Sequence, residues 1–195
     1  MDTPAAAVFL DRDGVLLEDR DLVVSPADLH ILPGVPGALR KLKRAGFRLI
    51  VVTNQAAVAR GLLSEQQLSE IHVEMCRRLV GAGAPPLDAV YFCPHHPEAT
   101  LPNYRVACEC RKPKPGMILR ASYEHGLNLA ASFLVGDRLT DVLAGTRAGC
   151  RSVLVRTGKH LDAPIVTAEP VDANVRADQE CADLEQAAEW ILEQQ

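Results

Sequence analysis

Short apolar runs alternate with stretches of helical periodicity along most of the chain. The apolar runs lie at 8–10, 49–52, 89–92, 133–135 and 153–155. The helical stretches lie at about 33–46, 64–81, 115–126 and 139–149, with a last one from about 182. Strands that alternate with helices are typical of a parallel sheet with helices on both faces. We therefore predict an α/β fold, a doubly wound parallel Rossmann-like sheet, in a single domain spanning residues 1–195.

The composition fits one soluble globular domain and gives no sign of a polyanionic partner. The chain has 195 residues, of which 48% are hydrophobic, and its formal net charge is -4. No apolar run approaches the roughly 18 residues that span a bilayer, and the start at 1–4 lacks the basic, apolar pattern of a signal peptide. We expect a cytoplasmic protein, monomeric, that binds a small phosphorylated metabolite and neither nucleic acid nor membrane.

Four polar or reactive side chains come just past the ends of predicted strands. They are Asp11, Thr53, Cys93 and Asp137. In a parallel open sheet the carboxyl ends of the strands meet at one edge, and ligands bind there. The sequence therefore predicts a functional site at that edge.

Asp11-Arg12-Asp13-Gly14 places two carboxylates directly after a buried strand. One carboxylate can attack phosphorus to form an acyl phosphate, and a second can protonate the leaving oxygen and then deprotonate water. A bare Asp-x-Asp usually means a solvated turn. The preceding strand and the following glycine favour a catalytic pair, with Asp11 as nucleophile and Asp13 as acid/base.

Thr53-Asn54-Gln55 offers a hydroxyl, two amides and backbone N–H groups that can hold phosphate oxygens. The alternative is a simple turn and helix cap, because Thr and Asn favour both. We expect the three residues to bind the phosphoryl group of the substrate.

The segment from Cys110 to Pro115 brings the three cations Arg111, Lys112 and Lys114 next to a predicted helix start. A fixed ammonium stabilises the charge that develops on phosphoryl oxygens. Without that role the run would be a solvated basic loop.

Asp137 also follows a strand and can complete an oxygen shell around Mg2+ together with Asp11. Asp141 lies one helical turn further on and can support the site. The alternative for Asp141 is a first-turn carboxylate that the helix dipole favours.

The irregular stretch at about 93–114 holds Cys93, His95, Cys108 and Cys110. Three thiolates and one imidazole form a closed tetrahedral shell that suits structural Zn2+. A loop of this length needs a function or an internal staple. His96 is the competing histidine.

Together these motifs resemble the haloacid dehalogenase superfamily of aspartate-nucleophile phosphatases over roughly residues 7–160. Within it the chain is most similar to the histidinol-phosphatase and D-glycero-D-manno-heptose 1,7-bisphosphate 7-phosphatase group. The motifs that carry the resemblance are Phe9-Leu10-Asp11-Arg12-Asp13-Gly14, Val51-Val52-Thr53-Asn54-Gln55, Cys93-Pro94-His95-His96-Pro97, Cys108-Glu109-Cys110-Arg111-Lys112-Pro113, Gly136-Asp137 and Leu154-Val155-Arg156-Thr157-Gly158.

The resemblance implies an open, capless site in which Mg2+ is bound by the side chains of Asp11 and Asp137 and the backbone carbonyl of Asp13. It implies that Thr53 and Lys112 hold the transferring phosphoryl group and that the 93–114 loop binds zinc. For substrate binding, it implies three further residues, which are Asp19, Arg111 and Arg138, with Arg138 reaching the second phosphate of the sugar.

The chain departs from the heptose enzymes at loops that approach the sugar. It has Leu17 where they usually carry Asn, Asp21-Leu22 where they carry Gly-Tyr, and Ala56-Ala57 where they carry Ser-Gly. None of these positions belongs to the phosphoryl-transfer residues.

The leading hypothesis is a magnesium-dependent phosphatase of a sugar bisphosphate, with histidinol phosphate as the alternative substrate. Two hypotheses from other classes are a non-catalytic binding module with a zinc-stapled loop and a nucleic-acid 3′-phosphatase. The intact acidic residues argue against the first, and the acidic net charge argues against the second.

Overall fold

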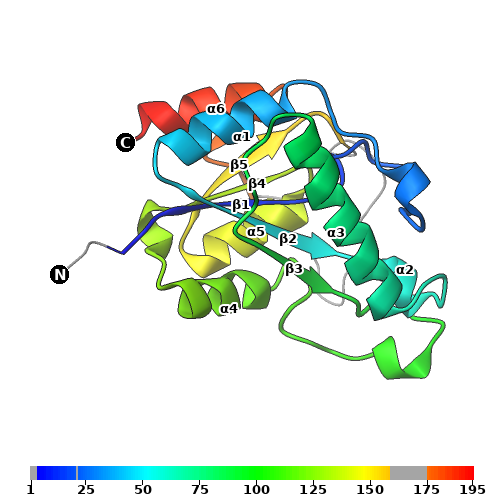
Figure 1. Ribbon diagram of the computed structural model, residues 1–195. Coiled ribbons are helices and arrows are strands. Elements are labelled where there is room, and N and C mark those ends of the chain that lie inside the picture. Colours follow the sequence, from blue (N-terminus) through cyan, green and yellow to red (C-terminus); the bar gives the residue numbers. More distant parts are fainter. Residues whose placement is uncertain (1–3, 21, 159–174) are drawn as a thin grey trace.

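A six-stranded, fully parallel sheet forms the centre of the molecule (Figure 1). The computed structural model describes residues 4–20, 22–158 and 175–195. The strands are β1 (Ala7–Leu10), β2 (Arg48–Asn54), β3 (Ala89–Cys93), β4 (Phe133–Gly136), β5 (Arg151–Val155) and β6 (Gln179–Cys181). Their order is β3-β2-β1-β4-β5-β6, so the first strand lies between β2 and β4 in the interior of the sheet. The predicted doubly wound fold is confirmed.

Helices cover both faces of this sheet. The helices are α1 (Val35–Arg44), α2 (Ala56–Ala59), α3 (Glu65–Gly81), α4 (Gly116–His125), α5 (Leu139–Ala148) and α6 (Leu184–Glu193), with 3-10 turns at Pro26–Asp28, Pro102–Tyr104 and Leu129–Ala131. In Figure 1, α1 and α6 lie above the sheet and α4 and α5 below it. None of the helices in the described part of the chain is long and apolar enough to cross a membrane.

The two sides of β1 build two separate cores. Val8 and Leu10 belong to a cluster that includes residues of α1, α3 and α6. Ala7 and Phe9 belong to a second cluster with residues of α4 and α5. Side chains alternate between the faces of a strand, so a strand covered on both faces is apolar throughout. This explains why β1 reads as an unbroken apolar run that ends at Asp11.

Several boundaries differ from the sequence-based expectation. The structure extends β2 through Asn54 and β3 through Cys93, so Thr53 and Cys93 lie in the last residues of strands and not beyond them. The sequence analysis missed the short helix α2 and the edge strand β6. Strand β6 consists of Gln179, Glu180 and Cys181, of which only the cysteine is buried, so it has no apolar run to detect.

Helix α3 begins as its sequence predicts. The side chain of Ser64 accepts a hydrogen bond from the backbone N–H of Gln67 at 3.1 Å, and the side chain of Gln67 accepts one from the backbone N–H of Ser64 at 2.8 Å. This reciprocal pair satisfies two backbone donors that the first turn leaves open. The final helix begins at Leu184, close to the expected position. The polar linker expected before it falls partly on residues 159–174, which lie outside the described residues.

Helix α5 packs so closely on the sheet that Gly145 has no room for a side chain. A Cβ atom there would lie 2.4 Å from the Ser152 hydroxyl and 2.9 Å from Cβ of Leu134. We expect Gly145→Ala to lower the free energy of unfolding by about 1–3 kcal/mol because both neighbours sit in the close-packed sheet. Urea denaturation followed by circular dichroism measures this.

Gly37→Ala in α1 is the matched control. The nearest atom to a Cβ at Gly37 is Nη2 of Arg40 at 3.9 Å, so the substitution adds helix propensity without a clash. We expect a gain of up to about 1 kcal/mol. Equal effects of the two substitutions would contradict the packing described for α5.

Candidate active site

A cavity of about 320 Å³ opens at the carboxyl-terminal edge of the sheet. All residues predicted to act in catalysis or substrate binding line it, namely Asp11, Asp13, Asp19, Thr53, Asn54, Gln55, Arg111, Lys112 and Arg138. The sequence analysis did not anticipate that Arg60, His96, Glu98 and Thr140 also line it.

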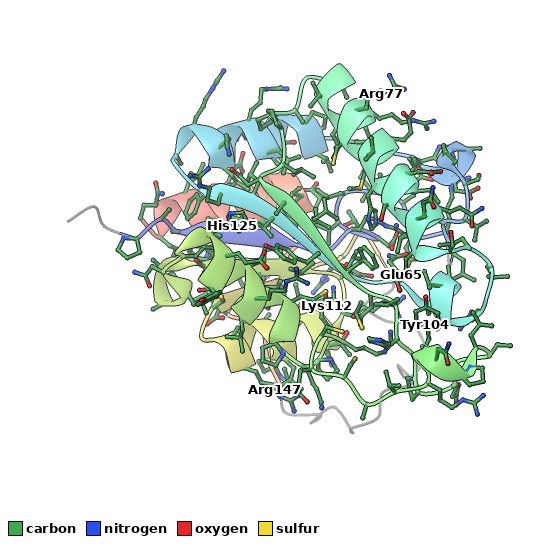
Figure 2. All side chains as sticks on the ribbon, turned by 60° about the horizontal axis from the view of Figure 1, so that its bottom comes forward. Glu65, Arg77, Tyr104, Lys112, His125 and Arg147 are labelled. Carbon is green, nitrogen blue, oxygen red and sulfur yellow. The ribbon has the colours of Figure 1, made fainter. Side chains whose placement is uncertain are left out.

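The ammonium of Lys112 lies buried between two carboxylates at the floor of this cavity. Nζ is 2.9 Å from Oδ1 of Asp11 and 2.5 Å from Oδ1 of Asp141, and it donates to the carbonyl oxygen of Val52 at 2.9 Å. Figure 2 shows Lys112 near the middle of the molecule. Charges this deeply buried are stable only when they are paired and hydrogen-bonded.

Burial and the ion pairs between Lys112 and its two carboxylates shift the pKa values of Lys112 and Asp141. Burial acts to lower the pKa of Lys112, but Asp11 and Asp141 outweigh it, so that the pKa lies above its ordinary value and the amine stays charged. Burial raises the pKa of Asp141 to about 6, although Lys112 acts in the opposite direction.

Three carboxylates converge beside Lys112. Asp11, Asp137 and Asp141 each place an oxygen so that all three oxygens lie within 4.8 Å of one another. Carboxylate oxygens are the donors that Mg2+ prefers, so the chemistry of this set fits the predicted ion. The structure thus brings the predicted pair Asp11 and Asp137 together and adds Asp141.

Two glycines make room for these carboxylates. A Cβ at Gly158 would lie 2.1 Å from Oδ2 of Asp137, and a Cβ at Gly136 would lie 2.1 Å from Cβ of Asp141. Any side chain at either position would displace an acidic group from the site. Both glycines belong to motifs on which the family resemblance rests.

Asp13 also lines the cavity but does not belong to the group of three converging carboxylates. Its Oδ2 accepts a hydrogen bond from Nε2 of Gln55 at 3.0 Å, and the same amide nitrogen donates to Oγ1 of Thr53 at 2.8 Å. Its carboxylate also forms an ion pair with Arg12, with Nη2 2.9 Å from Oδ2. The candidate acid/base and the candidate phosphate ligands therefore share one hydrogen-bond network.

Asn54 connects strand β2 to the loop that carries Lys112. Its side-chain amide donates to the carbonyl oxygen of Lys112 at 3.1 Å, and its Oδ1 accepts from the backbone N–H of Lys112 at 3.0 Å. The backbone N–H of Gln55 donates to the carbonyl oxygen of Cys93 at 2.8 Å. These bonds connect the end of β2 to both ends of the 93–114 loop.

Cys93, His95, Cys108 and Cys110 form a compact cluster within this loop. Sγ of Cys93 lies 3.6 Å from Sγ of Cys108, 3.0 Å from Sγ of Cys110 and 3.6 Å from Nδ1 of His95. A Zn–S bond of about 2.3 Å gives a tetrahedral edge of ~3.8 Å, which is close to the two separations of 3.6 Å and longer than the 3.0 Å between Cys93 and Cys110. The hydrogen-bonding contact with Cys93 lowers the pKa of Cys110 to about 5, which favours the thiolate that zinc requires.

The two neighbouring histidines of the loop point to different places. His95 belongs to the cysteine cluster, whereas the buried His96 lines the cavity and its Nδ1 accepts from the backbone N–H of Glu98 at 3.0 Å. The geometry therefore favours His95 over His96 as the fourth ligand.

The loop also contacts helix α3 on the outside of the molecule. The hydroxyl of Tyr104 donates to Oε1 of Glu65 at 2.9 Å, and Figure 2 shows these two residues side by side. Together with the contacts of Asn54 and Gln55, this bond fixes the loop at both of its sides.

Two arginines face the cavity beside His96. Nη1 of Arg111 donates to the carbonyl oxygen of His95 at 2.9 Å, and its Nε is buried without a hydrogen-bond partner among the described residues. Burial lowers the pKa of Arg111, and the nearby charge of Arg60 acts in the same direction. Burial likewise lowers the pKa of His96, and both arginines add to the effect. The cysteine cluster acts in the opposite direction on Arg111, and Glu98 does so on His96, so this part of the cavity holds charges of both signs.

Arg138 differs from these two arginines because its charge is balanced. Nη2 lies 3.1 Å from Oδ2 of Asp19, and Nε lies 3.8 Å from Oδ2 of Asp137. Arg138 also lines the cavity, and its predicted contact with a second phosphate stays a prediction.

The positions that depart from the heptose enzymes are divided between core and cavity. Leu17 and Ala57 are fully buried, whereas Leu22 and Ala56 line the cavity. Asp21 lies outside the described residues.

Comparison with known proteins gives consistent matches over nearly the whole chain. The HAD-hydrolase-like family model matches residues 109–187. The D-glycero-beta-D-manno-heptose-1,7-bisphosphate 7-phosphatase of Photorhabdus laumondii subsp. laumondii is 42% identical over 88% of this chain and 92% of its own length. The enzyme of the same name from Escherichia coli strain K12 is 41% identical over 95% of this chain and 87% of its own.

Solved structures agree with these relatives. D,D-heptose 1,7-bisphosphate phosphatase from B. bronchiseptica, complexed with magnesium and phosphate, superposes with a TM-score of 0.81 at 35% identity, over 97% of this chain and 99% of that one. The chain is a phosphatase, and it belongs to the D-glycero-beta-D-manno-heptose-1,7-bisphosphate 7-phosphatase family of HAD-like hydrolases.

Proposed function

We propose that the chain removes the 7-phosphate of D-glycero-D-manno-heptose 1,7-bisphosphate through an aspartyl-phosphate on Asp11, with Mg2+ bound in the site. The observation that supports this most is the position of Asp11 at the end of β1, 2.9 Å from the buried ammonium of Lys112 and beside Asp137. The substrate is that named for its relatives, the D-glycero-beta-D-manno-heptose-1,7-bisphosphate 7-phosphatases.

The reaction has two steps that use the same residues. In the first, a carboxylate oxygen of Asp11 bonds to phosphorus, the bond from phosphorus to the sugar oxygen breaks, and that oxygen takes a proton from Asp13. In the second, water attacks phosphorus, gives a proton to Asp13 and releases inorganic phosphate, which restores Asp11. Thr53 and Lys112 hold the phosphoryl oxygens in both steps.

The magnesium ligands we propose are the carboxylates of Asp11 and Asp137 and the backbone carbonyl of Asp13. Asp141 shares the acidic group, but its Oδ1 is bound to Lys112, so we assign it to holding the ammonium. The ion, when bound, supplies positive charge that offsets the charge on the transferring phosphoryl oxygens.

The second phosphate of the substrate is best accommodated by Arg60, Arg111 and His96. These cationic and donor groups lie at one end of the cavity, and the two arginines have no ion pair with a carboxylate among the described residues. Two guanidinium groups that form no ion pair with a carboxylate among the described residues can donate charge-assisted hydrogen bonds to a dianion. We assign Arg138, with its partner Asp19, to the sugar hydroxyls. We assign Asn54 and Gln55 to connecting strand β2 with the two ends of the 93–114 loop.

We also propose that Cys93, His95, Cys108 and Cys110 bind structural Zn2+. The sulfur and nitrogen donors of the cluster fit this ion, and full ligation leaves no position for a substrate. The single domain spanning 1–195, the monomeric state and the cytoplasmic location stay predictions.

Asp11→Asn is the direct test of the nucleophile. We expect magnesium-dependent phosphate release from heptose 1,7-bisphosphate to fall at least about a thousandfold, because the amide cannot form the acyl phosphate. Asp183→Asn is the control, since Asn can keep the cap on α6, where Asp183 accepts from the backbone N–H of Gln186 at 2.9 Å. Full activity of Asp11→Asn would refute the proposed aspartyl-phosphate mechanism. A clear preference for histidinol phosphate in a panel of phosphorylated metabolites would replace the heptose bisphosphate as the assigned substrate.

Arg60→Ala separates recognition of the second phosphate from the chemistry. We expect kcat/KM for the bisphosphate to fall about 10–100-fold, the loss of one or two charge-assisted hydrogen bonds. The kcat/KM for heptose 7-phosphate should stay within about twofold of the wild-type value, because this substrate lacks the second phosphate that Arg60 would contact. Arg77→Ala, on the outer side of α3 in Figure 2, is the control. An equal loss on both substrates would refute this assignment.

Cys108→Ser tests the zinc site and its link to catalysis. Arg111 and Lys112 directly follow Cys110, so we expect loss of bound zinc, a lower melting temperature and at least about tenfold lower activity. Metal content is measured by plasma mass spectrometry on the purified protein. Cys76→Ser, a half-buried thiol outside the cluster, should keep its zinc. Unchanged zinc content in Cys108→Ser would refute the site.

A further inference from the structure

His72 is a buried polar side chain on helix α3 that the phosphatase mechanism leaves unexplained. It lies between the core residues Ile71 and Met75 and is 5% exposed, and its ring packs against that of Phe92 with centroids 5.7 Å apart. Burial, assisted by the charge of Arg12, lowers the pKa of His72 to about 3, so the ring is neutral at physiological pH. A buried polar group of this kind is stable only with a hydrogen-bond partner.

The partner of His72 is Arg12, the residue between the two catalytic aspartates. Nη1 of Arg12 lies 3.2 Å from Nε2 of His72, and Arg12 is itself 1% exposed. A guanidinium only donates, so Nε2 of the neutral ring is the acceptor and the ring proton sits on Nδ1. The acceptor is therefore fixed by the chemistry of the pair.

The other edge of the same guanidinium holds Asp13. Nε of Arg12 lies 3.1 Å from both carboxylate oxygens, and Nη2 lies 2.9 Å from Oδ2. Since the guanidinium is planar and rigid, the direction of its Nη1–H bond fixes the plane in which the other nitrogens meet the carboxylate. A single line of contacts thus runs from His72 in the core through Arg12 to Asp13, and on to Gln55 and Thr53 at the phosphate site.

We propose that His72 is a positioning residue for the acid/base: it orients Arg12, and Arg12 orients the carboxylate of Asp13 for proton transfer to the leaving oxygen. This inference rests on the proposed role of Asp13. Among the described residues, His72 belongs neither to the cavity lining nor to either group of potential metal ligands. Without it, Nη1 of Arg12 would be a buried donor with no partner among the described residues, and we expect the guanidinium to turn toward another acceptor and take Asp13 with it.

The test compares two kinds of leaving group in His72→Leu. An alkyl phosphate needs a proton on its leaving oxygen, whereas p-nitrophenyl phosphate has a leaving group stable enough to depart without one. We expect kcat/KM for the sugar phosphate to fall about tenfold and that for p-nitrophenyl phosphate to stay within about twofold. Because kcat/KM reports only steps through transfer to Asp11, later hydrolysis of the aspartyl-phosphate does not enter the comparison.

His72→Gln supplies the conservative rescue and His72→Asn its counterpart. The Gln carbonyl oxygen can reach the place of Nε2 and accept from Arg12, so we expect the ratio of the two kcat/KM values to return to within about threefold of wild type. The shorter Asn cannot reach it, so its ratio should match that of His72→Leu. If His72→Leu does not fold, the Gln and Asn pair makes the same comparison.

Met75→Leu on the same buried face of α3 controls for a general effect of core substitution, because it removes no contact to Arg12. An equal loss on both leaving groups, unchanged kinetics in His72→Leu, or no difference between His72→Gln and His72→Asn would each overturn the inference. If the wild-type enzyme shows no aspartyl-phosphate on Asp11, the proposed mechanism fails first. A wild type that does form it, with an unaffected His72→Leu, overturns the role of His72 alone.

Discussion

The buried contact between Lys112 and the carboxylates of Asp11 and Asp141 depends on parts of the chain that are far apart in sequence. Asp11 follows the interior strand β1, Asp141 lies in the first turn of α5 after β4, and Lys112 comes from the loop beyond β3. An ammonium so deeply buried is stable only if both carboxylates arrive, and the carboxylates in turn need a cation close by. The parallel sheet satisfies this condition because the carboxyl ends of its strands share one edge.

The 93–114 loop positions Lys112, which supplies the positive charge of this contact. It begins at Cys93, where β3 meets the backbone of Gln55, and it returns to the sheet at Lys112, where the side chain of Asn54 binds the backbone in both directions. Between these points it carries the cysteine and histidine cluster and Arg111. We propose that a metal ion makes this loop rigid without taking part in the reaction, and that the same loop supplies one cation for the reacting phosphate and another for substrate recognition.

The sequence predicts the fold and most of the site because apolar strands and the polar residues at their ends are local signals. Asp11 and Asp137 could be placed together from two strand ends and a parallel sheet, and the fold and the phosphatase activity are confirmed. Local signals say nothing of Arg60, which follows a short helix without a motif, or of the ion pair that balances Arg138. Strand β6 was not predicted because an edge strand with one buried residue has no hydrophobic periodicity. His72 looks like an ordinary residue of the apolar face of a helix in the sequence, and only the structure shows its contact with Arg12.

The interior place of β1 bears on how the chain becomes active as it is synthesised. Asp11 emerges from the ribosome early, but β1 has a neighbour on only one side until residues 133–136 have been made. Asp137 and Asp141 also come late, and domains of this size generally fold as units. A nascent chain that stops before β4 therefore carries Asp11 and Lys112 without the two carboxylates that converge beside them. Premature termination would give protein that is inert toward cellular phosphates rather than an enzyme of relaxed specificity.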